Sequence, residues 1–299
     1  MSAASRGRPD IGVLMDRQAG PVLPSLVLGA RLRRLREQRG ISRQQAGAEI
    51  RSSESKINRM EMGRTGFKLR DIADLCTLYG VIDHAERADL LALARQANLP
   101  PWWQNYSDVV PDWFEMYLGL EQTAEIIRSY QVQFIPGLLQ THDYARGVVI
   151  LSHGEAPSEQ IERHVELRMR RQHILYRPQT TRLWALIDEA ALRRPVGGRA
   201  AMFRQLEHLI EVCELPNVTI QVLPFSMGGH AALGGPITLL RLPEPIIPEF
   251  IYLEQLNTAV YPGSAGDIDF YRHILNRLAV QAPPPKAAPA IMSELLKDL

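Results

Sequence analysis

Leucines at helical spacing mark the first segment that the sequence pattern predicts to be ordered. Leu28, Leu32 and Leu35 fall at positions i, i+4 and i+7, which places them on one stripe of a helix. Arginines occupy the positions around this stripe. Gly40 follows as a C′ residue, where a left-handed backbone ends a helix at low cost. We therefore expect the first helix to begin near Ser25 and to end before Gly40.

Four more helical segments follow within a short length of chain. Ser42 caps the second, very short helix, and Gln45 stands at the capping-box position. The third helix is capped at Ser52 or Ser53 and ends at Met62-Gly63, with Ile57 and Met60 inward. The fourth covers about Leu69–Tyr79, with Leu69, Ile72, Leu75, Cys76 and Leu78-Tyr79 inward, and the fifth covers about Asp83–Ala97. Five short helices within residues 25–98 predict a compact all-α domain.

The first 24 residues differ from this domain in composition. They are small and polar, are interrupted by Pro and Gly, and show no periodicity. We therefore expect residues 1–24 to be a disordered tail. Met15 lies within this tail and is a second candidate for the translation start, beside Met1.

The pattern changes after Asn98-Leu99-Pro100-Pro101, which stops the fifth helix. Strand and helix signals alternate from there, which predicts an α+β domain over residues 102–282, followed by a tail with a weak helix over 283–299. The expected strands are Val132–Ile135, Leu183–Ile187, Val218–Leu223, Ile237–Leu242 and Phe250–Leu253, and the expected helices are Ser158–Tyr176, Arg199–Glu214 and Ile268–Val280. The expected fold class is α+β overall, an all-α five-helix domain followed by an α+β regulatory domain.

Charge divides the chain in the same way as the pattern. The net charge is only +1, but residues 1–66 hold 13 Arg and Lys against 6 Asp and Glu, whereas residues 67–299 hold 21 against 27. A basic N-terminal region on a mildly acidic body indicates that this region meets a polyanion. Two cysteines without a CxxC pair suit the reducing cytoplasm, and no apolar run is long enough for a transmembrane helix.

The helical domain resembles the DNA-binding domain of the lambda-repressor, Cro and Xre family. The residues that carry the resemblance are Gly40-Ile41-Ser42, Ile50, Ile57, Met60-Glu61, Gly63-Arg64, Leu75 and Tyr79-Gly80-Val81. Three positions depart from the family pattern: Arg43 replaces Gln, Gly47 replaces Ala, and Arg51 replaces the Gly of the turn. Arg51 would need a left-handed or adjusted backbone, which implies a modest strain.

The resemblance implies that the third helix enters the major groove with its N-terminal residues at the base edges. Its outward residues are Glu54, Ser55, Asn58 and Arg59. An arginine pairs bidentately with guanine, an asparagine with adenine, and a glutamate accepts from cytosine N4. We therefore predict that these side chains read the DNA sequence.

Further side chains are predicted to hold the DNA backbone. Arg43 stands at the start of the second helix, beside exposed N–H groups, which suits a phosphate contact. Gln44, Ser53, Lys56 and Arg64 complete the predicted DNA-binding set. We expect Glu61 to have a structural role instead.

The second domain resembles a domain of unknown function that follows the helix-turn-helix in actinobacterial (Streptomyces) regulators. The matching phrases are Phe134–Thr141, Tyr144-Ala145, Arg168–Gln172, Asp188–Arg193, Asn217–Phe225, Gly229-His230 and Tyr252-Leu253-Glu254. Such proteins are pleiotropic or antitoxin-like regulators, often encoded beside a very small partner protein. The resemblance therefore implies a small partner protein encoded nearby.

Enzymatic chemistry finds little support in the second domain. Asp188 and Glu189 are adjacent carboxylates on an expected strand, where they would point to opposite faces, so we expect salt-bridge or capping roles. Glu254 lies on another expected strand, and His230 reads as a loop residue. The sequence shows no Walker, GxGxxG or HExxH motif, so we expect no cofactor, no metal and no enzyme.

An aromatic segment follows the boundary between the two predicted domains. Six of the chain's aromatic residues lie between Trp102 and Tyr117. Such a cluster is typical of a core, and Trp102, Trp103 and Trp113 are also candidates for a partner or inter-domain contact.

These observations favour a cytoplasmic, sequence-specific transcriptional regulator that binds double-stranded DNA and is controlled through its C-terminal domain. A homodimer is expected, because one short helix reads only a few base pairs. The alternative is an antitoxin-like interaction protein that sequesters a small partner protein. Neither function requires a membrane.

Overall fold

The computed structural model describes residues 20–178, 181–232 and 234–299. The chain forms two compact units: one extends to Gln104 and includes Leu242–Pro248, and the other comprises Asn105–Arg241 and Glu249–Leu299. Residues 1–19, which make up most of the predicted tail and include Met15, lie outside the described part.

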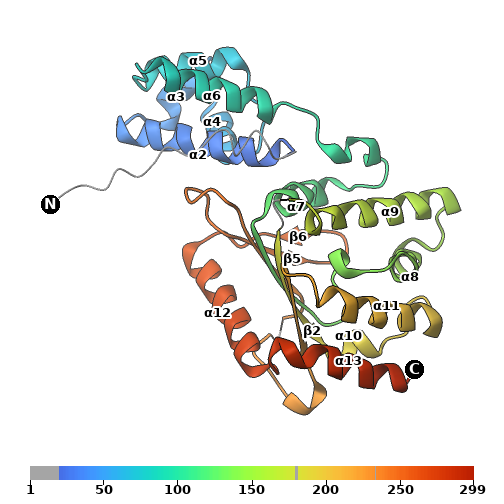
Figure 1. The fold of residues 1–299 in the computed structure, drawn as a ribbon. Coiled ribbons are helices and arrows are strands. Elements are labelled where there is room, and N and C mark those ends of the chain that lie inside the picture. Colours follow the sequence, from blue (N-terminus) through green and yellow to red (C-terminus); the bar gives the residue numbers. More distant parts are fainter. Residues whose placement is uncertain (1–19, 179–180, 233) are drawn as a thin grey trace. The chain divides into compact units, whose positions relative to one another are not determined.

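The N-terminal unit consists of helices, and the prediction of a five-helix all-α domain is confirmed. The helices are α2 (Val22–Gln38), α3 (Arg43–Glu49), α4 (Glu54–Glu61), α5 (Leu69–Leu78) and α6 (His84–Ala97), and η1 (Trp102–Tyr106) is a 3-10 helix that follows them. Figure 1 shows α2 to α6 packed around one another. Helix α2 begins at Val22 and not near Ser25, because Leu23 is fully buried and the fixed φ of Pro24 suits a first helical turn.

The expected helix signals and core positions are largely found in this unit. Gly40 has φ +63° directly after α2 ends, as a C′ glycine requires. Ile57, Met60, Ile72 and Leu75 are buried. Leu69, predicted to face inward, is instead 39% exposed, because it is the first residue of α5 and the buried face of that helix begins later.

A six-stranded mixed sheet forms the centre of the C-terminal unit. The strands are β1 (Ile126–Gln131), β2 (Arg182–Asp188), β3 (Val218–Leu223), β4 (Ile237–Arg241), β5 (Phe250–Glu254) and β6 (Ala259–Val260). Their order is β3-β2-β1-β4-β5-β6, with β1, β2 and β3 parallel and the other pairs antiparallel. The expected strands over β2, β3, β4 and β5 are confirmed.

The predicted strand over Val132–Ile135 is wrong. The strand that exists, β1, ends at Gln131, and the following residues turn toward Pro136. Arg128 and Ser129 interrupt the apolar run of β1 and hid it in the sequence. Because both of its neighbours in the sheet are supplied by strands distant in the chain, β1 is defined by pairing and not by its own pattern.

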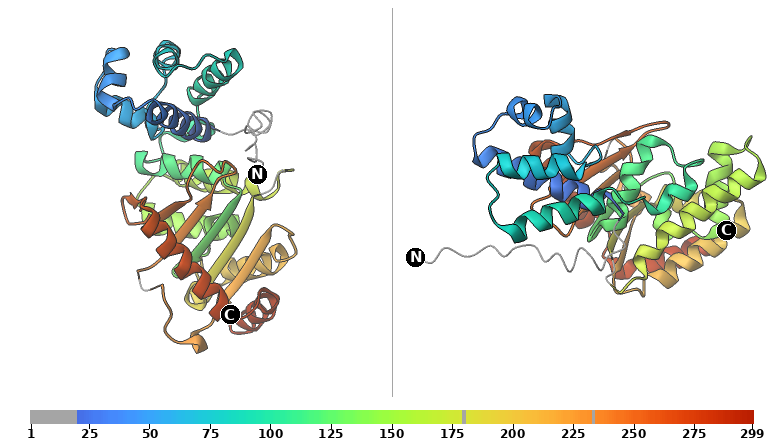
Figure 2. Two further views of the ribbon diagram at one scale, coloured as in Figure 1. Left: turned by 90° about the vertical axis from the view of Figure 1, so that its left-hand side faces the viewer. Right: turned by 90° about the horizontal axis from the view of Figure 1, so that it is seen from above.

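Helices cover both faces of this sheet. They are α7 (Asp112–Thr123), α8 (His142–His153), α9 (Ser158–Arg171), α10 (Glu189–Arg193), α11 (Arg199–Val212), α12 (Ala265–Gln281) and α13 (Ala288–Lys297), and the 3-10 helices are η2 (Gly137–Leu139), η3 (Gln172–Leu175), η4 (Phe225–Met227) and η5 (Pro285–Ala287). In the left view of Figure 2, α12 lies across the front of the sheet, and α8 to α11 lie on the opposite side in Figure 1. The α+β class predicted for this unit is therefore confirmed.

The face of the sheet under α12 carries an apolar core. Tyr130, Leu186 and Ile251 extend from the strands to pack with Leu275 and Leu278 of α12. Helix α13 packs on α11 and β3. Among the described residues, no helix is long and apolar enough to cross a membrane.

Candidate DNA interface

The turn between α3 and α4 is built by local hydrogen bonds. Ser42 and Gln45 form the predicted capping box at the start of α3. Arg51 has φ +53°, the left-handed conformation that its position was expected to need, and the Ser52 N–H donates to the Gly47 carbonyl at 2.8 Å. A Cβ on Gly47 would lie 2.8 Å from the Ser52 oxygen. Gly therefore replaces the usual Ala here because this turn passes too close for a methyl group.

Two buried apolar side chains and one ionic network hold helix α4 in place. Ile57 and Met60 are each 1% exposed, and Ser53, not Ser52, caps the helix by accepting from the Lys56 N–H. The Glu61 carboxylate at the other end of α4 accepts from Arg36 Nε and Nη2 at 2.5 and 3.0 Å. The predicted structural role of Glu61 is visible in these bonds.

Arg43 is part of the same ionic network. Its Nε donates to Glu61 at 3.0 Å, and its side chain is 33% exposed. Arg36 also lies 3.6 Å from Glu37, which pairs with Arg33, so the network joins three arginines to two carboxylates and keeps an excess positive charge. This arrangement suits the predicted phosphate contact, because the network orients the Arg43 guanidinium without neutralising it.

Most of the predicted DNA-binding residues lie on the outward side of α3 and α4. The exposed ones are Gln44, Ser53, Glu54, Ser55, Arg59 and Arg64. Asn58 is half-buried, and so is Lys56, whose ammonium lies 2.7 Å from Asp71 of α5. Lys56 therefore ties α4 to α5, so it has less freedom to reach a phosphate than the prediction assumed.

Sequence reasoning left out three basic residues beside this face. Arg51 is exposed in the turn directly before α4. Lys68 and Arg70 are exposed at the start of α5, which the Lys56–Asp71 ion pair joins to α4, and Arg70 also lies 3.7 Å from Asp74. In the sequence, only the excess of basic residues in this region pointed to them. That excess does not show which basic side chains lie on one surface. We add them as candidate phosphate contacts.

The carboxylates singled out in the second domain have structural roles. Asp188 ends β2 and caps α10 by accepting from the Ala190 N–H, and Glu189 accepts from Arg193 Nε at 2.6 Å and from the Phe225 N–H at 2.7 Å. The expected capping and salt-bridge roles are confirmed. The expectation that both lie on one strand is wrong, because α10 begins at Glu189.

His230 also lies at the carboxyl end of the parallel strands, where its side chain contacts two residues of the sheet. Its Nε2 lies 3.2 Å from the Tyr130 hydroxyl and 3.5 Å from Asp188, and its Nδ1 accepts from the Ala232 N–H. His230 is thus a loop residue, as expected, and these contacts fasten its loop to β1 and β2.

The three tryptophans considered for a partner contact fall in different units. Trp102 and Trp103 belong to the N-terminal unit and pack edge to face with ring centroids 5.8 Å apart. Trp103 is 3% exposed, which favours a core role. Trp113 lies in the C-terminal unit against Phe114. A partner role for the three remains a prediction.

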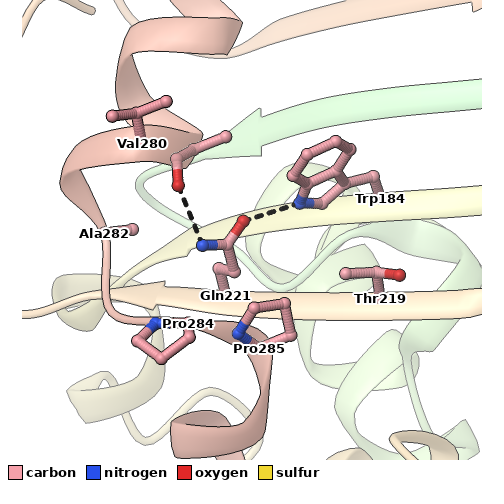
Figure 3. A pocket seen from close by; sticks show the side chains of 8 residues that line it. Trp184, Thr219, Gln221, Val280, Ala282, Pro284 and Pro285 are labelled. Atoms are coloured by element: carbon pink, nitrogen blue, oxygen red, sulfur yellow. Dashed lines mark hydrogen bonds between the residues drawn. The ribbon is translucent and has the colours of Figure 1, made fainter.

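A hollow of about 530 Å³ lies beside the edge strand β3 (Figure 3). Gln221 occupies its centre, accepting from the Trp184 indole at 2.8 Å and donating to the carbonyls of Ala279 and Pro283. Because this amide is fully bonded, the hollow offers a ligand little polar recognition. Among the described residues, no group of three or more His, Cys, Asp or Glu is arranged to hold a metal ion.

Comparison with protein families agrees with this division of the chain. Residues 27–90 match the model of a helix-turn-helix domain, and residues 114–294 match the model of a domain of unknown function, DUF5753. Neither model describes an enzyme. No curated protein and no solved structure matches the chain. Since the second match covers more than half of the chain, the protein belongs to the DUF5753 family and carries a helix-turn-helix domain in front of it.

Proposed function

We propose that the protein is a sequence-specific transcriptional regulator of the Xre type that binds double-stranded DNA through α3 and α4 and is controlled through its C-terminal unit. One observation carries this proposal. Helix α4 presents Glu54, Ser55 and Arg59 on its exposed side, while Ile57 and Met60 anchor its other side. A rigidly held helix with base-reading side chains on its free face is what major-groove recognition requires.

Salt dependence tests the binding directly. With roughly 4–6 phosphate contacts per subunit, the slope of log affinity against log salt is expected near −4 to −5 per subunit. Genomic footprinting supplies the duplex, and fluorescence anisotropy at several salt concentrations supplies the slope. A slope near zero on the best genomic site would contradict the proposal.

The regulator is proposed to act as a homodimer with its contact in the C-terminal unit. Helix α12 supports this, because Phe270 and Val280 are 59% and 85% exposed on a helix whose opposite side is core. A two-fold dimer would protect an inverted repeat whose half-sites lie a whole number of helical turns apart. Light scattering on Phe270→Glu tests it, and an unchanged dimer mass together with a footprint lacking dyad symmetry would exclude this arrangement.

An antitoxin-like role is the second candidate, and α8 supports it. Ile150 and Leu151 are 40% and 68% exposed beside a hollow of about 360 Å³ that Val196 and Gly197 help to line. Exposed aliphatic residues next to an apolar hollow suit a small partner protein. Co-expression with the product of any small gene encoded beside this one tests this role. Leu151→Glu is expected to abolish copurification, and Leu256→Glu is the exposed control.

A further inference from the structure

Helix α12 carries a stripe of exposed side chains on the side turned away from the sheet. Phe270, His273, Arg277 and Val280 follow one another at i, i+3, i+7 and i+10, which places them on one stripe of the helix. All four are exposed, whereas the residues on the opposite side of α12 are buried in the core. The stripe therefore has a large apolar side chain at each of its ends.

The hollow beside β3 begins where this stripe ends (Figure 3). Val280 lines it together with Trp184 of β2 and with Pro284 and Pro285, which follow α12. Its central polar residue, Gln221, has its amide bonded to the Trp184 indole and to two main-chain carbonyls. The rest of the lining is mostly apolar, so an apolar side chain is the group that this hollow of about 530 Å³ accepts best.

Within one chain, Phe270 does not reach this hollow. It precedes Val280 by ten residues, and at the rise of an α-helix the two positions lie about 15 Å apart along the axis. A second copy that packs its α12 antiparallel to this one, with the two-fold axis near Leu275, brings the partner's Phe270 beside Val280. The same operation brings Phe270 beside the partner's Val280, so the helix is complementary to itself.

The charges along α12 favour the same antiparallel orientation. Asp267 and Asp269 are exposed near its beginning, and Arg277 and Lys286 are exposed near and beyond its end. Asp269 also pairs with Arg272 of the same helix, whereas neither Arg277 nor Lys286 forms an ion pair within the described part of the chain. An antiparallel pair places the acidic end of one helix beside the basic end of the other, and it sets the two helix dipoles in opposite directions.

We propose that the hollow beside β3 is a pocket of the homodimer interface and that the partner's Phe270 fills it. The ring packs against Trp184, Val280 and Pro284, and the contact occurs twice in a two-fold dimer. An aromatic side chain in an apolar pocket is the kind of contact that carries most of the free energy of an interface. This arrangement rests on the homodimer of the proposed function, and it adds that each hollow is complete only with a residue of the other copy.

Sedimentation equilibrium of the full chain measures the dissociation constant of the dimer. Phe270→Ala removes both aromatic contacts and is expected to raise that constant about a hundredfold or more. Phe225→Ala, at a phenylalanine of η4 that is 58% exposed, is the matched control and is expected to leave it unchanged. Equal dissociation constants for the unaltered chain and Phe270→Ala would overturn the pocket and keep the homodimer. An unaltered chain that is monomeric at every concentration would contradict both.

Mixed cysteine variants test which residues face each other. Copies with Phe270→Cys are mixed with copies with Val280→Cys and oxidised with diamide. A disulfide between the two chains is expected in the mixture, because the new cysteines lie side by side and the second aromatic contact of the mixed dimer is intact. Neither variant alone should cross-link, since its two new cysteines lie about 15 Å apart in the dimer. Cross-linking of the separate variants but not of the mixture would show a parallel pair and overturn the proposal.

The indole of Trp184 shows whether the hollow itself is filled. In a chain that carries fluorotryptophan, the fluorine resonance of Trp184, assigned with Trp184→Phe, is expected to differ between the dimeric chain and monomeric Phe270→Ala. Trp103, which is 3% exposed in the N-terminal unit, is the internal reference. A Trp184 resonance that is the same in dimer and monomer would reject the pocket. None of these measurements uses DNA, so a chain that failed to bind DNA would contradict the proposed regulator and leave the dimer results standing.

Discussion

The two units of this protein treat buried arginines in different ways. In the N-terminal unit Arg36 is buried against Glu61, and that carboxylate also accepts from Arg43. In the C-terminal unit Arg171 is paired in the same manner with Glu121, but Arg168 beside it has no partner among the described residues. The complete network fixes α2, α3 and α4 in one arrangement, as a surface that recognises DNA requires.

The largest effect on stability is expected when Glu61 is removed from its network with Arg36 and Arg43. Glu61→Ala removes the nearest carboxylate of the buried Arg36, which keeps only Glu37 at 3.6 Å and the Ile41 carbonyl at 2.9 Å, and it also releases Arg43. The N-terminal unit should therefore lose about 3 kcal/mol of unfolding free energy. DNA binding should be lost with it. Urea unfolding of the full chain, followed by circular dichroism and compared with the unaltered chain, measures the change.

Asp74→Ala is the control for this prediction. Asp74 lies 3.7 Å from Arg70 on the surface of α5, and their side chains are 40% and 75% exposed. Its loss should change stability by no more than about 0.5 kcal/mol. If the two variants were equally stable, the network would not be what holds α2, α3 and α4 together.

The next largest effect on stability is expected where helices α2 and α4 approach each other closely. A Cβ on Gly29 of α2 would lie 2.5 Å from the Met60 carbonyl oxygen of α4, so Gly29→Ala should destabilise the N-terminal unit by about 1–3 kcal/mol. Gly266 in α12 has only ordinary contacts, and Gly266→Ala should stabilise by up to about 1 kcal/mol. The same substitution thus takes opposite signs in the two units, and thermal unfolding of both variants shows whether it does.

The sequence predicted the N-terminal unit better than the other because its signals are local. Ser42, Gln45 and Gly40 act within one turn of their own helices, and the structure has each in its expected place. Contacts between distant residues had no such signal. The pairing of Arg43 with Glu61 and of Lys56 with Asp71 follows from how α3, α4 and α5 pack.

In the C-terminal unit, the features that the sequence did not predict depend on contacts between residues far apart in the chain. Strand β1 is defined by partners that lie far along the chain, so its own residues gave the wrong strand. Tyr252 was visible only as part of a family resemblance, and its packing on Tyr117, with ring centroids 4.2 Å apart, arises because the fold brings α7 and β5 together. The candidate base-reading residues, by contrast, lie on one short helix and were predictable from its periodicity.

Base recognition by α4 should be specific to one position for each side chain. Arg59→Ala is expected to cost about 1–3 kcal/mol of binding free energy and to relax the preference at one base pair, because a bidentate pair to guanine is lost. Arg43→Ala should weaken all duplexes alike, as a phosphate contact does. Arg95→Ala, on the exposed side of α6, removes the same charge as a control. Selection of bound sequences from a random pool measures all three, and a uniform loss for Arg59→Ala would exclude its base contact.

The smallest expected effect concerns pH and falls on the C-terminal unit. His164 of α9 packs on His153 of α8 with ring centroids 4.2 Å apart, and burial, followed by the charges of His153 and Arg168, lowers the pKa of His164 to about 4. In the unfolded chain a histidine takes up its proton near pH 6.5. Between pH 6.5 and 4 the unfolded state therefore binds more protons than the folded state, so the unfolding free energy falls as the pH falls through this window.

His164→Gln should flatten that slope. The ring is partly accessible and solvent screens its interactions, so we expect a difference of about 1–2 kcal/mol between pH 6.5 and 4 and no difference above pH 7. His173→Gln, at an exposed position after the same helix, is the matched control.

Burial also lowers the pKa of His208 on α11, so part of the slope should survive in His164→Gln. The described N-terminal unit has one histidine, the exposed His84, and its stability should respond to neither substitution. A slope that moved with His173 instead would show that surface charge, and not the histidine pair between α8 and α9, sets the acid sensitivity of this unit.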